Sequence, residues 1–256
     1  MKNIFIIVFA LLAGTLQSVA ASMQQLQNLV CFVRFAGEDD AQFQRTPESY
    51  TTLFNGTGAE DNSVFRYFWL ASYGQLMWTS EFCPAMDGGI KSYQTQMPRS
   101  YYQPYDVNTN PDGYQDATSA AAREQALVKE IAAWLGDNLP AGTNVDCNGD
   151  GIVDNLTIVF SGGSDLASKY MLWPHRSVLT LPVSIAGAKV TGYLLVFDSA
   201  NGYSSLKGIA LNTGVLCHEM SHSLGTYDLY HVNDKLNPVG VWDLMSDNQL
   251  VAQQMT

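Results

Sequence analysis

The sequence predicts an α/β fold, and three kinds of segment support this prediction. Continuous apolar runs at 29–35, 155–160 and 193–197 are typical of strands that are buried on both faces of a sheet. An alanine-rich segment at 116–139 carries apolar residues at helical spacing, which indicates a helix that packs on the sheet as a backing helix. A second helix is expected at about 214–224, where polar residues recur four positions apart.

The N-terminal residues of the 256-residue chain have the layout of a cleavable export signal. Lys2 precedes an apolar run from Ile4 to Leu12, and small residues follow this run. We therefore expect a signal peptide at 1–21 and a secreted or periplasmic protein. The segment 22–256 is long enough for one well-cored domain or for two closely packed lobes around a cleft. No stretch of it approaches the ~20 apolar residues of a membrane-spanning helix.

The charge balance narrows the range of partners. Thirteen Lys and Arg residues oppose twenty-four Asp and Glu residues, which gives a net charge of −11. A surplus of negative charge argues against nucleic acid or an anionic membrane as a partner. Either solubility or cation binding explains the acidity. We expect a monomer.

Three further features organise the first half of the chain. Residues 64–70 resemble a short aromatic-rich helix whose aromatic side chains are expected in the core. Residues 84–115 are rich in Gly, Pro, Asn, Gln and Tyr, which is typical of a long surface loop that either shapes a cleft or is decorative. Asp116 is placed to cap the backing helix, and Pro140 follows its end.

Oxygen-bearing side chains alternate in the loop before the second predicted strand. They are Asp146, Asn148, Asp150 and Asp154, and Gly151 lies where a tight loop must bend. This arrangement matches the first half of a calcium loop. Thr replaces the bidentate Glu that would complete an EF-hand. We therefore expect either a partial calcium site or a plain Asx-rich turn.

The four cysteines, Cys31, Cys83, Cys147 and Cys217, allow three disulfide pairings, and the sequence selects none of them. An exported protein can form disulfides. Cys217 immediately precedes His218, and neighbouring helical residues diverge by about 100°. We therefore expect Cys217 in the core or in a disulfide, and not as a metal ligand.

The second predicted helix contains the pattern His218-Glu219-Met220-Ser221-His222. Because residues four apart lie on one helix face, His218 and His222 can offer two imidazole nitrogens to a single zinc ion. Glu219 lies beside that ion, where its carboxylate can take a proton from water. The alternative is a chance match on an ordinary amphipathic helix. Three of the four histidines fall within fourteen residues, which favours the metal site.

A catalytic zinc usually has three protein ligands and one open position, so this site needs a third ligand beyond the helix. Asn212 or Thr213 can cap the helix at its start, and Gly225 can end it in the left-handed conformation. Asp228 then falls ten residues after His218, where the metzincin pattern places its last ligand. That ligand is more often a histidine, but an oxygen ligand is chemically acceptable.

Three residues near the metal-binding helix have two interpretations each. Tyr230 and His231 follow Asp228 closely, so they either contact substrate or the oxyanion, or belong to the surface of that loop. In metzincins a methionine in a tight turn underlies the metal, and Met245 lies at a suitable distance along the chain. Core filling is the commonest role of a methionine.

Together these motifs resemble the immune inhibitor A family of secreted bacterial metallopeptidases. The similarity spans most of residues 28–246, and the order of the motifs is more specific than the zinc pattern alone. The motifs are the early strand 28–35, the segment 72–76, the loop with Asp146 and Asp154, the segment Leu172-Trp173-Pro174-His175, the helix with Gly225 and Asp228, and the segment 242–246.

The resemblance implies a metzincin-like domain with a twisted mixed sheet, a backing helix and an active-site helix. It also implies zinc at His218, His222 and Asp228, Glu219 as general base and acid, and calcium near 146–154. The chain departs from the family in two ways. It stops ten residues after Ser246, so we expect a truncated lower lobe, and no tyrosine follows the predicted methionine turn.

Two functions are compatible with this sequence. The first is a zinc endopeptidase that acts on proteins and peptides. The second is a catalytically silent module that contains zinc and calcium and binds a partner, or an inactive truncated peptidase. Glu219 favours the enzyme, because a site that only binds has no need for a carboxylate beside the open position. A serine hydrolase is disfavoured, because no Gly-x-Ser-x-Gly elbow occurs. His175 either lines the cleft or makes a structural hydrogen bond, and we favour the structural role.

Overall fold

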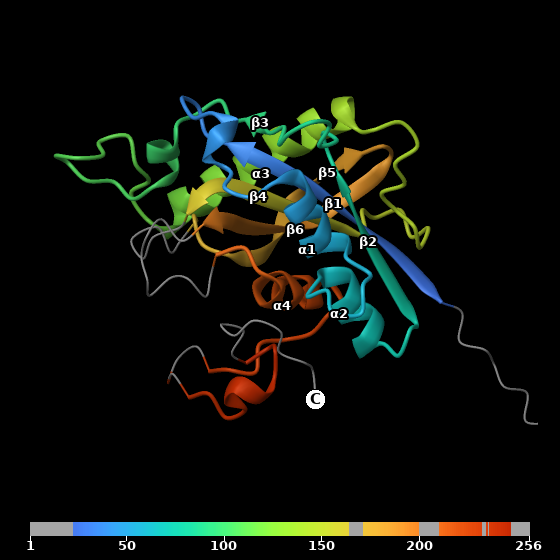
Figure 1. The fold of residues 1–256 in the computed structure, drawn as a ribbon. Coiled ribbons are helices and arrows are strands. Elements are labelled where there is room, and N and C mark those ends of the chain that lie inside the picture. The colour runs from blue at the N-terminus through green and yellow to red at the C-terminus, as the bar shows by residue number, and fades with distance from the viewer. Residues whose placement is uncertain (1–22, 164–170, 200–209, 232–233, 235, 247–256) are drawn as a thin grey trace, which may run out of the picture.

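A six-stranded mixed sheet organises the protein (Figure 1). The computed structural model describes residues 23–163, 171–199, 210–231, 234 and 236–246, so the predicted signal peptide lies outside the described residues. The strands lie in the order β2-β1-β4-β6-β5, and β3 pairs with β1 beyond the end of β2. Among the strand pairs of the described residues, β5–β6 alone is antiparallel. The strands are β1 (Gln24–Arg34), β2 (Leu76–Phe82), β3 (Tyr93–Gln94), β4 (Asn155–Gly163), β5 (His175–Ile185) and β6 (Ala188–Ser199).

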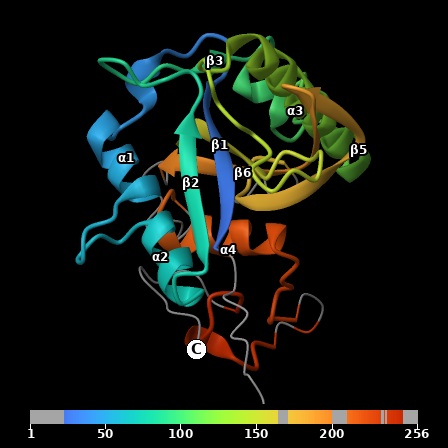
Figure 2. The same ribbon diagram turned by 90° about the vertical axis from the view of Figure 1, so that its right-hand side faces the viewer.

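Helices cover both faces of the sheet (Figures 1 and 2). Because side chains alternate along a strand, Leu29 and Cys31 of β1 face one layer and Val30 and Phe32 face the other. The first face packs against α3 (Ala117–Asn138). The second packs against α1 (Pro47–Asn55), α2 (Val64–Ala71) and α4 (Thr213–Ser223). These two apolar layers confirm the predicted α/β architecture.

The backing helix α3 begins and ends as predicted. The Asp116 side chain accepts a hydrogen bond from the Ser119 amide at 2.7 Å, and the Ser119 hydroxyl accepts one from the Asp116 amide at 2.9 Å. This reciprocal capping box satisfies two donors that the helix start would otherwise leave free. Leu127 and Ile131 are fully buried against the sheet.

The buried strands are found where apolar runs predicted them, but three elements were not predicted from the sequence. These are α1, β2 and the edge strand β5, besides the two-residue strand β3 within the predicted loop. On β2 buried and half-buried residues alternate, and β5 is largely exposed and contains Pro182. Such strands lack the continuous apolar run that marks a doubly buried strand.

The aromatic segment is helical, but its expected burial is only partly correct. Phe68 is buried, whereas Trp69 is exposed and stacks on Phe65 with ring centroids 6.2 Å apart. The predicted surface loop 84–115 includes β3 and buries Tyr102 and Tyr114 in the core. Part of this loop therefore completes the hydrophobic layer around α3.

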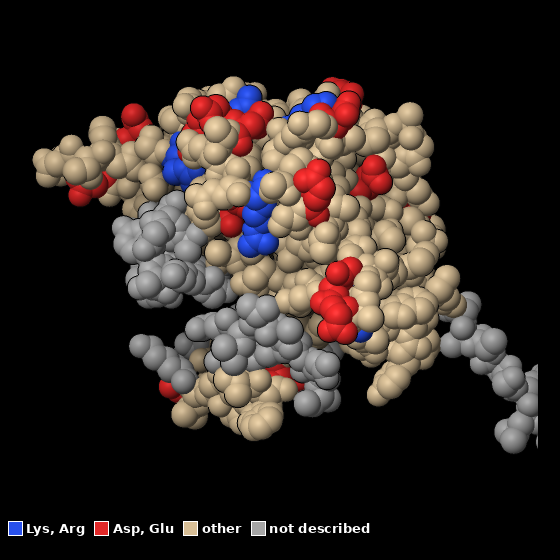
Figure 3. Space-filling view, in the orientation of Figure 1, with Lys and Arg blue, Asp and Glu red and all other residues tan. Residues whose placement is uncertain are grey.

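All four cysteines are free thiols, and Cys217 is fully buried in the core. On the face shown in Figure 3, acidic and basic side chains of the described residues are interspersed, with acidic groups in excess. Within the described segments, no helix combines the length and the apolar character needed to cross a membrane.

Candidate metal centre

The helix α4 carries the metal-binding pattern, and its two ends are defined by local hydrogen bonds. The Asn212 side chain accepts from the Val215 amide at 2.9 Å, so Asn212 is the N-cap. Gly225 follows the last turn with φ of 89°, a left-handed conformation that favours glycine. This turn redirects the chain back toward the helix, so the residues after it can approach the same site.

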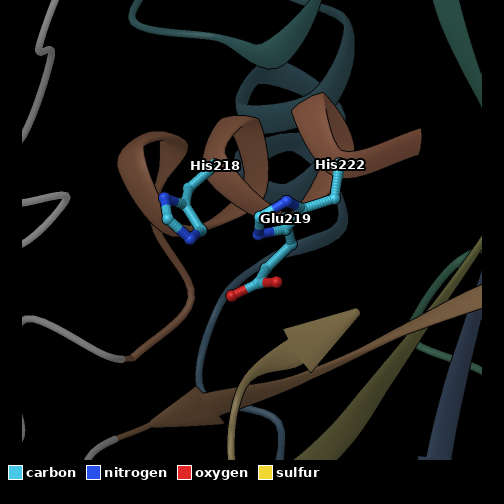
Figure 4. A group of neighbouring side chains, drawn as sticks. All are labelled: His218, Glu219 and His222. Carbon is cyan, nitrogen blue, oxygen red and sulfur yellow. The ribbon is translucent and has the colours of Figure 1, made fainter. Parts of the chain in front are cut away.

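Three side chains of α4 project from one side of the helix (Figure 4). His218, Glu219 and His222 each offer a ligand atom within 4.8 Å of the others. His218 and Glu219 are buried, and His222 is half-buried. The spacing of the motif therefore produces the cluster that helical geometry predicts.

Backbone carbonyls orient both imidazole rings. His218 Nδ1 lies 2.9 Å from the Leu244 carbonyl oxygen, and His222 Nδ1 lies 2.9 Å from the Thr226 carbonyl oxygen. A carbonyl oxygen only accepts hydrogen bonds, so Nδ1 of each ring carries the proton. In the neutral imidazoles, Nε2 therefore carries a free lone pair, which is the form that binds a metal.

Both Nε2 atoms point at one oxygen of Asp228. Asp228 Oδ1 lies 3.2 Å from Nε2 of His218 and 3.4 Å from Nε2 of His222. Zinc bonds of 2.0–2.1 Å in a tetrahedron separate neighbouring ligand atoms by about 3.3 Å. The two distances from Asp228 Oδ1 to the imidazole nitrogens therefore match the spacing of neighbouring ligands in a tetrahedral site. A cation between these atoms would offset the repulsion of their lone pairs. Glu219 also lies near these nitrogens, but the shared close contacts favour Asp228 as the third ligand.

Glu219 lies beside these donors in a buried environment. Burial raises the pKa of Glu219, and the charge of Asp228 raises it further. His218, His222 and His175 act in the opposite direction, but the pKa of Glu219 remains above its usual value. A carboxylate with a raised pKa is a stronger base, which suits proton transfer from water.

The segment around Met245 forms a tight turn against the metal centre. The Met245 amide donates to Asp243 Oδ1 at 2.8 Å, and the Met245 carbonyl accepts from the Leu229 amide at 2.8 Å. Leu244, whose carbonyl binds His218, lies in the same turn. Met245 is buried. The turn therefore contacts both the helix and the segment that carries Asp228.

The two other residues near Asp228 have different surroundings. The Tyr230 side chain lies near two carboxylates, and partial burial together with the negative charges of Asp228 and Glu219 raises the pKa of Tyr230 to about 12. His231 is exposed, and its Nδ1 lies 3.0 Å from each carboxylate oxygen of Asp234. The structure therefore places Tyr230 near Asp228 and Glu219, and His231 in a surface contact with Asp234.

His175 lies at the first residue of β5 and contacts the backing helix. Its Nδ1 lies 2.6 Å from the Trp173 carbonyl oxygen, and its Nε2 lies 3.1 Å from Glu124 Oε1. Both contacts are structural hydrogen bonds. The role of Glu124 was missed from the sequence, although a charged residue on the buried stripe of α3, between Ala120 and Leu127, was a usable signal.

The loop at 146–154 is tightly held by its own acidic side chains. Asp146 Oδ1 accepts from the amides of Gly149 at 2.8 Å and Asp150 at 3.0 Å, and Asp146 Oδ2 accepts from the Gly151 amide at 2.9 Å. Asp154 Oδ2 accepts from the Gln27 and Cys147 amides, each at 2.9 Å, whereas Asp154 Oδ1 is buried and has no hydrogen-bond partner. Asp154 thus links the loop to β1 and directs one unsatisfied oxygen inward.

A mixed sheet, a buried His-Glu-His cluster on a helix and a methionine turn beneath it together define a metallopeptidase catalytic domain. The family model described as the immune inhibitor A peptidase M6 catalytic domain matches residues 86–254, about two thirds of the chain. The chain belongs to this family, which confirms the resemblance predicted from its motifs. No curated protein matches the chain.

Proposed function

We propose that this chain is an exported zinc endopeptidase that hydrolyses peptide bonds within proteins and peptides. The observation that carries the proposal is the convergence of two imidazole Nε2 atoms on Asp228 Oδ1, at 3.2 and 3.4 Å. Histidine and carboxylate donors at tetrahedral spacing are the ligand set of a catalytic zinc with an open position. The predicted export signal at 1–21 supports action outside the cytoplasm.

The residues around the site have separate roles in this proposal. Zinc held by His218, His222 and Asp228 would polarise the scissile carbonyl and acidify water at the open position. Glu219 would take a proton from the attacking water and pass it to the leaving amine, because one buried carboxylate can act first as base and then as acid. The Tyr230 hydroxyl would donate a hydrogen bond to the developing oxyanion.

The position of β5 supports a polypeptide substrate. Among the described residues β5 pairs only with β6, and it packs against α4. An extended peptide can add to the edge of a sheet through backbone hydrogen bonds, whatever its side chains are. A peptide paired there would be bound along its backbone and not by its ends, beside the helix that carries the metal-binding residues. This mode of binding favours cleavage of internal peptide bonds.

Calcium in the 146–154 loop is the second part of the proposal. Asp154 Oδ1 is buried without a partner, and burial followed by the charges of Asp146 and Asp150 raises the pKa of Asp154. A calcium ion that these carboxylates and Asn148 hold would satisfy that oxygen and compensate the clustered charge. The alternative is an Asx-rich turn, for which the three amides bound by Asp146 are sufficient.

A silent metal-containing module is the competing function. The burial of Glu219 argues against it, because a buried carboxylate costs stability that a binding site has no reason to retain. The substitution Glu219→Gln separates the two functions, because it removes the base and preserves the shape of the side chain. We expect the variant to bind one zinc ion per chain and to lose cleavage of an unfolded protein substrate.

Glu60→Gln is the matched control, because Glu60 is exposed and lies far along the chain from the motif. It should cleave at the wild-type rate. Equal cleavage by wild type and Glu219→Gln would reveal a contaminating protease and would contradict the proposed mechanism. A zinc-loaded but inert wild type would favour the silent module.

A further inference from the structure

A buried carboxylate lies behind the edge strand, outside the metal centre. The Glu124 side chain on α3 is 7% exposed. Its Oε1 accepts a hydrogen bond from the Tyr193 hydroxyl at 2.6 Å and faces His175 Nε2 at 3.1 Å. A buried carboxylate is tolerated when a cation and hydrogen bonds compensate it. His175 is the cationic partner that the structure places within ion-pair distance of Glu124.

The hydrogen bonds around Glu124 indicate where the protons lie. The Gln125 side-chain amide donates to the Tyr193 hydroxyl oxygen at 3.2 Å, so the Tyr193 hydrogen is free to be donated to Glu124. Glu124 Oε1 thus acts as an acceptor toward Tyr193.

Both nitrogens of His175 face groups that only accept. Nδ1 lies 2.6 Å from the Trp173 carbonyl oxygen, and Nε2 lies 3.1 Å from the Glu124 carboxylate. A neutral imidazole has one N–H group and can satisfy only one of these acceptors, whereas an imidazolium satisfies both. The geometry therefore corresponds to a doubly protonated, cationic His175.

The position of this ion pair relates it to catalysis. His175 is the first residue of β5, and the next residue, Arg176, donates from Nε to the Ser223 hydroxyl of α4 at 3.2 Å. The start of the edge strand is therefore held from both layers, to α3 through His175 and to α4 through Arg176. Glu219 is the second carboxylate close enough to interact electrostatically with His175.

We propose that the Glu124–His175 ion pair is a positioning device, in which an imidazolium fixes the first residues of the edge strand beside the catalytic centre. His175 acts through the strand and touches neither the reacting bond nor the metal ligands. The proposal rests on the proposed peptidase function for its catalytic consequence. Its structural part, a cationic His175 bound to Glu124, is independent of activity.

The charged groups around His175 determine how the ion pair depends on pH. Burial lowers the pKa of His175, but the hydrogen bond and charge of Glu124 on α3, the Trp173 carbonyl and the charge of Glu219 on α4 outweigh it, so the pKa is raised. Tyr193 on β6 stays neutral, because burial and Glu124 raise its pKa. The stabilisation is therefore complete below the unfolded value of about 6.5 and is lost as pH rises through the raised pKa.

Two substitutions and one spectrum test the proposal. His175→Gln removes the cation, and Glu124→Gln removes the anion while it preserves a side-chain carbonyl acceptor. His231→Gln is the matched control, because His231 pairs with Asp234 on the surface. Imidazole ¹⁵N NMR of the zinc-loaded wild type, with His175 assigned from the His175→Gln spectrum, should show both ring nitrogens protonated at pH 7. In Glu124→Gln one of them should be unprotonated.

Kinetics separate positioning from a purely structural role. With zinc content unchanged, both variants should raise KM for a peptide substrate by about 10- to 100-fold, because the edge strand is displaced, and should change kcat less. In the wild type, KM should rise as pH increases through the raised pKa of His175, because the ion pair is then lost. This rise should be absent from both variants and present in the control.

A neutral His175 at pH 7 would overturn the proposal, as would wild-type KM values at every pH in both variants. The NMR arm stays decisive if His175→Gln folds poorly, because the His231→Gln spectrum identifies His231 and the zinc-free spectrum identifies His218 and His222, which leaves His175 as the fourth histidine. It also stays decisive if the chain proves inactive, so failure of the ion pair and failure of the peptidase function give different results.

Discussion

The Nδ1 atom of His218 donates to the backbone carbonyl of Leu244 at 2.9 Å, and this bond joins the active-site helix to the methionine turn. Leu244 and Met245 are adjacent, and the Met245 carbonyl in turn accepts from Leu229, next to Asp228. The turn therefore connects a histidine of α4 with the loop that supplies the carboxylate. Displacement of either side would alter the spacing of the three metal-binding atoms.

The first prediction concerns Asp228. Asp228→Asn keeps the size of the side chain and removes its charge, so the two Nε2 atoms lose the anionic oxygen that they share. Loss of an orienting group near a zinc site costs about 10- to 100-fold in affinity, so loss of a direct ligand should cost at least about 100-fold. Zinc competition with a chromogenic chelator measures this change. Asp234→Asn is the control and should bind zinc as the wild type does, and equal affinity of Asp228→Asn would exclude Asp228 as a ligand.

The second prediction concerns Met245. Met245→Ala removes a buried side chain beneath the metal centre and should lower the free energy of unfolding by about 2–5 kcal/mol. Because the turn holds His218, the zinc affinity should fall as well. Chemical denaturation and zinc titration measure the two effects. Met97→Ala, at a position that is 38% exposed, should change both much less. A destabilised variant with unchanged zinc affinity would show that Met245 only fills the core.

The third prediction concerns Tyr230. With a pKa of about 12, its hydroxyl stays protonated at neutral pH and can donate to an oxyanion. Tyr230→Phe should therefore lower kcat by about 100-fold or more, with little change in KM or zinc content. Tyr227→Phe is the control, because Tyr227 is exposed. A wild-type kcat in Tyr230→Phe would assign this residue to the loop surface.

The sequence predicted those parts of the fold and site that depend on local pattern. The backing helix could be predicted because its cap and its apolar stripe lie in one contiguous segment of the sequence. The cluster of His218 and His222 could be predicted because helical spacing determines it. The edge strand β5 was not, because exposure removes the apolar run. The hydrogen bonds to the carbonyls of Leu244 and Thr226 could not be predicted from the sequence either. Every residue has a carbonyl, and only the fold determines which one contacts a histidine.

The fourth prediction concerns the 146–154 loop. Asp154→Asn should weaken calcium binding by at least about tenfold, because it neutralises the buried oxygen that has no hydrogen-bond partner. Isothermal titration of the calcium-free protein measures the affinity, and thermal unfolding with and without calcium measures the linked stabilisation. Asp112→Asn, at an exposed position in another loop, is the control. If the wild type shows neither a heat of calcium binding nor a calcium-dependent shift in Tm, the loop is an Asx-rich turn.

The fifth prediction concerns Glu38, which holds the loop after β3 to the sheet. Arg99 Nε donates to Glu38 Oε1 at 2.7 Å, and both side chains are mostly buried. Burial raises the pKa of Glu38, but the hydrogen bonds from Arg99 and Ser161 and the charge of Arg99 outweigh it, so the pKa is lowered. The stabilisation is therefore present above the unfolded value of about 4.3 and is lost as pH falls through the lowered pKa.

Glu38→Gln should consequently lower the free energy of unfolding by about 2 kcal/mol at pH 7, since one partner of a largely buried pair is removed. The difference from wild type should shrink as pH falls below 4, because protonation of Glu38 then removes the same charge in the wild type. Urea unfolding at a series of pH values measures it. Glu60→Gln, on the exposed surface, should show no such trend. A wild-type advantage that stays constant down to pH 3 would mean that packing of the side chain, and not its charge, stabilises this contact.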